Sequence, residues 1–286
     1  IVRYLQTRYN GFSLEDYIEK NFKGMFKRIL LYSIQTQLQR NVYSMSIGVK
    51  KMKDINGIIS ILTQYNGGDI KSMMSLYKPG MFEKSLEQQI IKLTSDNSIL
   101  RSFLIGLLNG NRSQNISTSS TIHDLIEEDT LFLGRLLNQE QWDSMDAAKF
   151  VDIFTRCSFQ YIKLLSESFQ KLATISLIDA FKGSLGAKED IGYAVNCVLL
   201  FVTDKQSFYR KLLKKGMIYG GHKYILFWRV IIDRMDMDLM EILNGYGRYE
   251  GGKSDVDKYN LTHFVKVKLC KDDENAAKLL MKICNF

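Results

Sequence analysis

Proline is almost absent from this sequence of 286 residues, which contains only Pro79. Because proline interrupts helices, its scarcity favours a helical chain, as does the abundance of Leu, Ile, Lys, Met and Glu. An apolar run of about 20 residues, long enough to cross a bilayer, is also missing. The most apolar stretch, residues 191–202, is about half that length and predicts a buried helix.

The sequence has few of the residues and motifs that carry catalysis or bind zinc. Its four cysteines show no CxxC spacing, which favours free thiols in a reducing compartment. Its three histidines form no HExxH motif and lie beside no plausible nucleophile, and neither a P-loop nor a GxGxxG motif occurs. Asp233, Asp236 and Asp238 have the wrong spacing for an EF-hand, and we expect a polar cluster at a helix end. We therefore predict that the protein is not an enzyme.

Basic residues outnumber acidic ones by 39 to 31, which gives a net charge of +8. This excess favours anionic partners such as acidic lipid headgroups or nucleic acid, although a solvated basic surface without a partner explains it equally well. The basic residues form no dense run interleaved with aromatics, so nucleic acid is not an expected partner. The first residues lack the features of a signal peptide and begin as though within a helix, so we expect the natural N-terminus to lie outside this sequence.

Helical periodicity recurs in units of about 70 residues. The tetrapeptides SLED (13–16) and SLEQ (85–88) are 72 residues apart, and each precedes an interrupted pair of helices. In the second pair, one helix runs from Leu86 to Thr94, Asn97 can cap the next, and that helix ends at Leu108. Residues 58–77, 150–169 and 224–243 repeat another order: a helix, a turn and a second helix. The Ser/Thr/Asn-rich stretch 113–124 has no periodicity and predicts a linker.

Three short motifs, in their order and spacing, resemble the annexin family. Residues 107–112, LLNGNR, resemble the LLxxNR pattern that ends the second annexin repeat. Residues 279–284, LLMKIC, resemble in part the closing LxxLC pattern. Residues 228–239 resemble the fourth-repeat pattern, in which an arginine between apolar residues is followed by a basic residue and then acidic-x-Asp-Leu. The resemblance covers nearly the whole chain and looks closer to protist annexins and alpha-giardins than to vertebrate annexins.

The resemblance implies an all-α core of four five-helix repeats, shaped as a curved disc with its interhelical loops on the convex face. It assigns residues 1–40 to the C-terminal part of repeat 1, 41–112 to repeat 2, 113–124 to a linker, 125–203 to repeat 3 and 204–286 to repeat 4. The first two helices of repeat 1 would precede Ile1. Trp228 lies among apolar helical residues and is expected in the core.

The annexin resemblance also implies a calcium site in the stretch MIYGGH (217–222). Annexin loops of the type MKGxGT bind Ca²⁺ through backbone carbonyls, and glycine allows these carbonyls to converge on one ion. By this alignment Met217, Tyr219 and Gly221 supply carbonyls, Asp272 supplies the carboxylate after a shift of one residue, and His222 replaces the usual threonine. A vestigial turn that only connects two helices is the alternative.

The other three loops match the family pattern less well. In repeat 2, Met52-Lys53-Asp54 replaces Gly-Thr-Asp and Leu93 replaces the acidic ligand. In repeat 3, Ser144 replaces a glycine. In repeat 1, Asn21 replaces the acidic ligand. Trp142 lies where some annexins carry an exposed tryptophan that enters the membrane interface, a position that suits an indole. The alternative for Trp142 is a loop aromatic packed on its own repeat.

The function implied is peripheral binding to acidic phospholipid membranes, dependent on calcium held in weak or degenerate loops. The alternative is a calcium-independent scaffold for cytoskeletal or other proteins, of the alpha-giardin type. Both functions place the protein in the cytoplasm, peripheral to membrane or cytoskeleton, as a monomer or weak oligomer. Both expectations rest on resemblance of fold, and only a functional site can distinguish between them.

Overall fold

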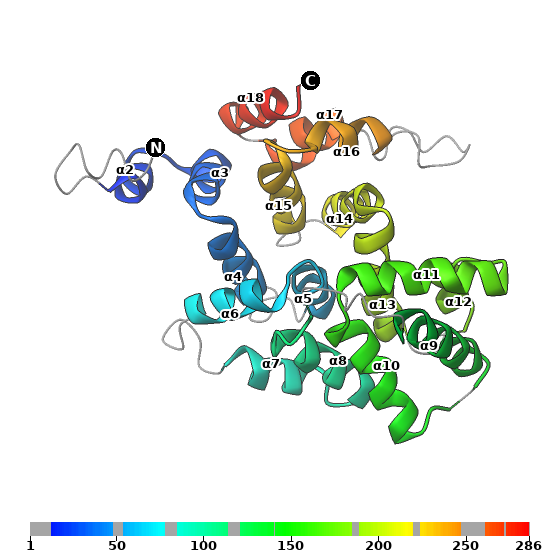
Figure 1. Cartoon of the computed structure of the whole chain (residues 1–286). Coiled ribbons are helices and arrows are strands. Elements are labelled where there is room, and N and C mark those ends of the chain that lie inside the picture. Colours follow the sequence, from blue (N-terminus) through cyan, green and yellow to red (C-terminus); the bar gives the residue numbers. More distant parts are fainter. Residues whose placement is uncertain are drawn as a thin grey trace. The chain divides into compact units, whose positions relative to one another are not determined.

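The computed structural model describes residues 13–47, 54–77, 85–113, 121–139, 141–184, 189–219, 224–246, 261–271 and 273–285. Within these ranges every regular element is a helix, which confirms the predicted all-α class. The chain divides into two compact units. Unit 1 consists of Ile1–Arg40 and Tyr209–Phe286, and unit 2 of Asn41–Phe208. The chain passes from one unit to the other within α4 (Gln37–Ile47) and within α14 (Lys205–Tyr219) (Figure 1).

Unit 2 contains nine further helices among its described residues. They are α5 (Ile55–Leu62), α6 (Gly67–Leu76), α7 (Leu86–Leu93), α8 (Ser98–Leu108), α9 (Thr121–Leu137), α10 (Ser144–Arg156), α11 (Phe159–Ala173), α12 (Leu177–Ser184) and α13 (Glu189–Thr203). Helix α8 packs on α10, α9 packs on α11, and α13 packs on α5, α11 and α12 (Figure 1). Three phenylalanine rings form the centre of the α10–α12 contact, with Phe150 5.1 Å from Phe154 and 5.8 Å from Phe181 between ring centroids.

Unit 1 contains helices from both ends of the described chain. They are α2 (Leu14–Asn21), α3 (Gly24–Ile34), α15 (Tyr224–Arg234), α16 (Leu239–Tyr246), α17 (Leu261–His263), the π-helix η4 (Phe264–Leu269) and α18 (Glu274–Ile283). Helix α18 packs on η4 and on α3. The rings of Phe227 and Phe264 lie 5.1 Å apart, and Trp228 is 8% exposed with its ring edge-on to Tyr32. The core position expected for Trp228 is therefore confirmed.

Polar residues placed just before helices explain where many of the helices begin. The side chain of Asn97 accepts a hydrogen bond from the backbone N–H of Leu100, as predicted for the start of α8. Ser85 and Gln88 form a reciprocal capping box at α7. Such caps satisfy N–H groups that have no partner inside the helix, and each contributes about 1 kcal/mol. The predicted interruptions between α7 and α8, and between α15 and α16, are also present.

One boundary differs from the sequence prediction. Helix α9 begins at Thr121, so residues 121–124 are helical and were wrongly assigned to the linker. The same small polar residues that suggest a linker are also common at helix starts, and Asp124 in the first turn interacts favourably with the helix dipole. The rest of that stretch, residues 114–120, and the helix expected at residues 1–12 lie outside the described residues. The division into repeats remains a prediction.

Candidate functional site

The predicted calcium loop connects α14 to α15 in unit 1. Helix α14 ends at Tyr219 and α15 begins at Tyr224. Gly216, in the last turns of α14, approaches α15 so closely that a Cβ atom there would lie 2.7 Å from the backbone nitrogen of Phe227. Real Cβ atoms do not come this close to backbone, so the glycine is required for the two helices to meet just before the connecting loop.

Two of the four predicted calcium ligands lie at the end of α14. Met217 and Tyr219 are in its last turn, and the Met217 side chain is 5% exposed. The last turn of a helix presents carbonyl groups at the negative end of the helix dipole, an arrangement that suits a cation. Gly221, His222 and Asp272 lie outside the described residues. All five assignments therefore remain predictions.

Asp273, the acid next to the predicted ligand Asp272, has a structural role. Its Oδ1 accepts the N–H of Ala276 at 3.0 Å and so caps α18, while its Oδ2 accepts the N–H of Phe26 at 2.8 Å in the first turn of α3. One carboxylate thus caps two helices from opposite ends of the chain. Because both oxygens are already engaged, Asp273 is a poor substitute for Asp272 as a calcium ligand.

Polar residues of the other loops are engaged in local structure. Asp54 is 8% exposed and its side chain caps α5 through the N–H of Gly57. Asn21 donates its side-chain amide to the carbonyl of Tyr17 at 2.8 Å. Ser144 is the first residue of α10, whose cap is Asp143. Among the residues that the structure describes, no three His, Cys, Asp or Glu side chains lie close enough together to hold a metal ion.

Trp142 is half-buried in unit 2 and packs on α10. Its ring centroid lies 4.7 Å from that of Phe150, and its indole N–H donates to the carbonyl of Leu136 at 3.2 Å. Ring packing and a satisfied N–H favour the packed alternative over insertion into a membrane. Membrane contact by Trp142 remains a prediction.

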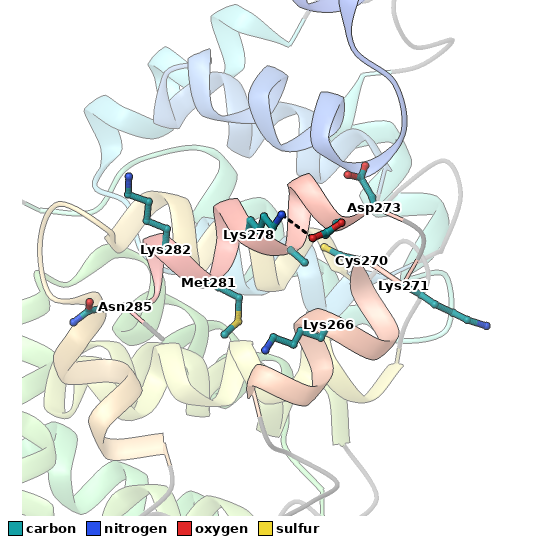
Figure 2. Close-up of a pocket in the computed structure, with 10 residues that line it drawn as sticks. Lys266, Cys270, Lys271, Asp273, Lys278, Met281, Lys282 and Asn285 are labelled. Carbon is teal, nitrogen blue, oxygen red and sulfur yellow. Dashed lines mark ion pairs between the residues drawn. The ribbon is translucent and has the colours of Figure 1, made fainter.

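A cavity of about 850 Å³ in unit 1 was not anticipated from the sequence. It lies along α18 and η4, and its lining includes four lysines, Lys266, Lys271, Lys278 and Lys282 (Figure 2). Lys278 and Lys282 have the i, i+4 spacing of one helix face, so this part of the cavity lining could be predicted from the sequence. The lysine on η4 faces this helix only through the tertiary fold, which periodicity does not reveal.

The comparisons with known proteins agree with this architecture. The sequence matches no protein-family model. It is 25% identical to human annexin A3 over 287 residues, which cover 96% of this chain and 83% of the relative. It is 24% identical to mouse annexin A1 over 251 residues, 87% of this chain and 68% of the relative.

Solved structures with the same fold come from several annexins. An annexin III structure covers 100% of this chain, with 83% of its own chain matched, at a TM-score of 0.75 and 21% identity. A structure of apo-annexin (Sm)1 has a TM-score of 0.80 at 19% identity, and the match covers 100% of this chain and 81% of the other. A calcium-bound structure of alpha-14 giardin has a TM-score of 0.71 at 14% identity. The match covers 98% of this chain and 87% of the giardin chain.

The helical repeats, the sequence similarity along nearly the whole chain and the shared fold define an annexin-type core. The similarity to annexins A3 and A1 and the shared fold support the assignment of this chain to the annexin family.

Proposed function

We propose that this protein binds acidic phospholipid membranes peripherally and depends on calcium to do so. The ion would be held by the carbonyls of Met217, Tyr219 and Gly221 and by the carboxylate of Asp272. His222 would lie next to the lipid headgroups, and Trp142 would contribute only the exposed edge of its ring. This function places the protein in the cytoplasm, at a membrane surface.

The observation that carries the proposal is the geometry of the α14–α15 junction. Helix α14 ends inside the motif that resembles an annexin calcium loop, and the glycine contact at Gly216 brings α15 close beside it. Backbone carbonyls and carboxylates are the oxygen donors that calcium prefers, so the donor chemistry of these residues fits the ion. Calcium has six to eight ligands, and a set of three carbonyls and one carboxylate leaves positions for water and a lipid phosphate.

A weak calcium site would be assisted by the positive charge of the protein. Each lysine or arginine near an anionic membrane contributes about 1 kcal/mol, an effect that falls off within about 10 Å and weakens as salt concentration rises. The net charge of +8 therefore favours acidic over neutral lipids. Membrane binding by charge and membrane binding by calcium differ in their response to salt, and this difference makes them separable.

The second candidate is a calcium-independent scaffold that binds a cytoskeletal or other protein. It is supported by the engagement of Asp273 and Asp54 in helix caps, which removes two carboxylates near loop positions from calcium binding. Likeness to alpha-giardins does not by itself favour a calcium-independent role, because the alpha-14 and alpha-11 giardin structures are both calcium-bound.

Other properties of the protein are proposed on the same basis. Membership of the annexin family points to a non-enzymatic protein. None of the helices in the described ranges is both long enough and apolar enough to cross a membrane. We expect a monomer or weak oligomer, with no nucleic acid partner.

Co-sedimentation with phosphatidylserine vesicles tests the proposal, in millimolar calcium and in chelator, each at low and high salt. Pelleting only with calcium, lost in Gly221→Val, is the expected result, because a valine blocks the backbone conformation that brings the carbonyls together. Salt-sensitive pelleting in chelator would assign binding to the basic residues instead. No pelleting under any condition would reject membrane binding and leave the scaffold.

A further inference from the structure

Three methionines are exposed where α15 is followed by α16 in unit 1 (Figure 1). Met235 is 40% exposed, Met237 61% and Met240 39%, and we call these three residues the methionine patch. A single exposed apolar side chain is ordinary on a protein surface, whereas a cluster marks a surface that binds something. No other six consecutive residues in the described ranges expose three large apolar side chains.

The backbone that carries the methionine patch is firmly held. The Nε atom of Arg234 lies 2.6 Å from Oδ1 of Asp238, at the other end of the turn, and its guanidinium stacks on the ring of Tyr209. The N–H of Met237 donates to the carbonyl of Arg234 at 3.0 Å. Leu239, the first residue of α16, is 2% exposed and anchors the turn in the core. The methionines therefore project from an ordered turn, so little backbone order has to be gained when a partner binds.

The charge around the methionine patch is opposite in sign to that of the whole chain. Residues 235–244 contain three acidic residues and no basic residue, although the net charge of the chain is +8. Asp238 is paired with Arg234, whereas Asp236 and Glu241 are exposed. The positive end of the α16 dipole is equivalent to about half a charge, which two carboxylates outweigh. The patch is therefore an apolar surface bordered by negative charge.

These features fit a basic amphipathic helix better than a membrane. Methionine is unbranched and polarizable, so it adapts to apolar side chains of different shapes and is common at surfaces that bind peptides. A helix presents apolar residues on one face at i, i+3 and i+4, about 5–6 Å apart, and lysines or arginines beside that face can reach the carboxylates. An acidic membrane is a poor partner, because its headgroups repel Asp236 and Glu241.

We propose that the methionine patch binds a basic amphipathic helix of a partner protein. The apolar face of that helix covers the methionines, and its cations pair with Asp236 and Glu241. This binding needs neither calcium nor lipid and does not rest on the calcium loop after α14. It adds a protein-binding surface to the membrane function proposed for that loop, and it is tested independently of it.

The test is fluorescence anisotropy of a labelled synthetic peptide of leucine and lysine, with its leucines on one helix face, titrated with the whole chain in chelator and without lipid. One control peptide has the same composition in scrambled order, and a second has glutamate in place of lysine. We expect the basic amphipathic peptide to bind at least about tenfold more tightly than either control. The net charge of the protein by itself favours the acidic peptide, so this order of affinities isolates the local charge of the patch.

Met237→Gln/Met240→Gln should weaken binding of the basic peptide by about tenfold or more, because it makes two apolar side chains polar at nearly constant size. The matched control is Leu172→Gln/Ile175→Gln, which removes two exposed apolar side chains of unit 2 and should leave binding within about twofold. Circular dichroism establishes that each variant is folded.

Asp236→Asn/Glu241→Gln should weaken binding by about threefold or more and make it less sensitive to salt, because it removes the exposed charges beside the patch. Glu87→Gln/Asp96→Asn makes the same change in net charge at two exposed residues of unit 2 and should leave both the affinity and its salt dependence unchanged.

Equal binding by the patch variants and their unit 2 controls would overturn the proposal, since it would show that the peptide binds elsewhere. Tighter binding of the acidic peptide, or no binding of the basic one, would overturn it as well. Loss of vesicle pelleting in Met237→Gln/Met240→Gln, with peptide binding unchanged, would assign the patch to the membrane instead. Because the peptide titration contains neither calcium nor lipid, its outcome is separate from that of the calcium loop.

Discussion

Units 1 and 2 each place a buried arginine shortly after an eleven-residue helix, and the two arginines are satisfied differently. In unit 1, Arg40 follows α3 and its Nε lies 2.6 Å from Oδ1 of Asp233, at the end of α15. In unit 2, Arg112 follows α8 and donates to the backbone carbonyls of Phe154 and Cys157, at the end of α10. The partner of Arg40 is a charged carboxylate, whereas the partners of Arg112 are two neutral carbonyl groups.

The difference extends to the surroundings of each arginine. Arg112 lies over the ring of Phe159, 4.5 Å from its centroid, near the phenylalanine cluster of α10. Around Asp233 the structure gathers Arg229 and Arg234, both buried, with Arg234 paired to Asp238 and stacked on Tyr209. Arg40 therefore belongs to a group of buried charges, whereas Arg112 contacts backbone carbonyls and an aromatic ring. Each unit should respond differently when its arginine is removed.

Arg40→Met should cause the largest loss of stability, about 3–5 kcal/mol, because it leaves Asp233 buried without its closest cation. The Asp233 side chain is only 6% exposed. Arg40→Met/Asp233→Leu removes both charges and should recover most of the loss. Urea denaturation followed by circular dichroism measures both variants, and equal losses in the two would contradict the charge-balance explanation.

Arg112→Met should cost about 2 kcal/mol, less than the loss in unit 1, because it leaves two buried carbonyls unpaired and no net charge. Burial lowers the pKa of Arg112 to about 10, so its guanidinium is charged at neutral pH and interacts with these carbonyls as a cation. The same denaturation experiment measures this variant. A loss larger than that of Arg40→Met would reverse the proposed order of the two units.

Asp273→Ala should cost about 2 kcal/mol, because it removes the caps of α18 and α3 together. The matched control is Asn97→Ala in unit 2, which removes the cap of α8 alone and should cost about 1 kcal/mol. Equal costs for the two variants would mean that the contact between Asp273 and the first turn of α3 contributes nothing. Thermal unfolding monitored by circular dichroism is sensitive enough for this comparison.

Trp142→Phe should have the smallest effect, about 1 kcal/mol, since it keeps an aromatic ring beside Phe150 and removes the hydrogen bond to the carbonyl of Leu136. In a Trp228→Phe background, Trp142 is the only tryptophan, and its fluorescence reports its surroundings. A packed Trp142 should show little change when vesicles and calcium are added. A clear blue shift would instead place its ring in the membrane interface.

Local features of this fold could be predicted from the sequence. The cap at Asn97, the break between α7 and α8, and the buried Trp228 follow from periodicity and capping residues close in the chain. The start of α9 was misplaced because small polar residues occur both in linkers and at helix starts. The expected polar cluster of Asp233, Asp236 and Asp238 is present only in part, since Asp233 and Asp238 pair with arginines and Asp236 is exposed in a turn.

The long-range contacts of the fold could not be predicted in this way. Arg40 and Asp233 are 193 residues apart, and Asp273 and Phe26 are 247 apart. No local pattern encodes such pairs, because either residue alone resembles an ordinary surface charge. The cavity along η4 and α18 could not be predicted for the same reason, since it is formed only when the two helices pack together. The calcium loop, by contrast, was proposed from family resemblance, and its glycine and acid lie outside the described residues.

The most direct test of the central proposal is a calcium titration of phosphatidylserine vesicle binding with the native protein and Asp272→Asn. Asparagine keeps the size of the side chain and removes its charge, so calcium affinity should fall while the fold is preserved. We predict that half-maximal binding of the variant requires about tenfold more calcium, with the same binding at saturation. Identical curves for the two proteins would contradict the calcium site that we assign to Met217, Tyr219, Gly221 and Asp272.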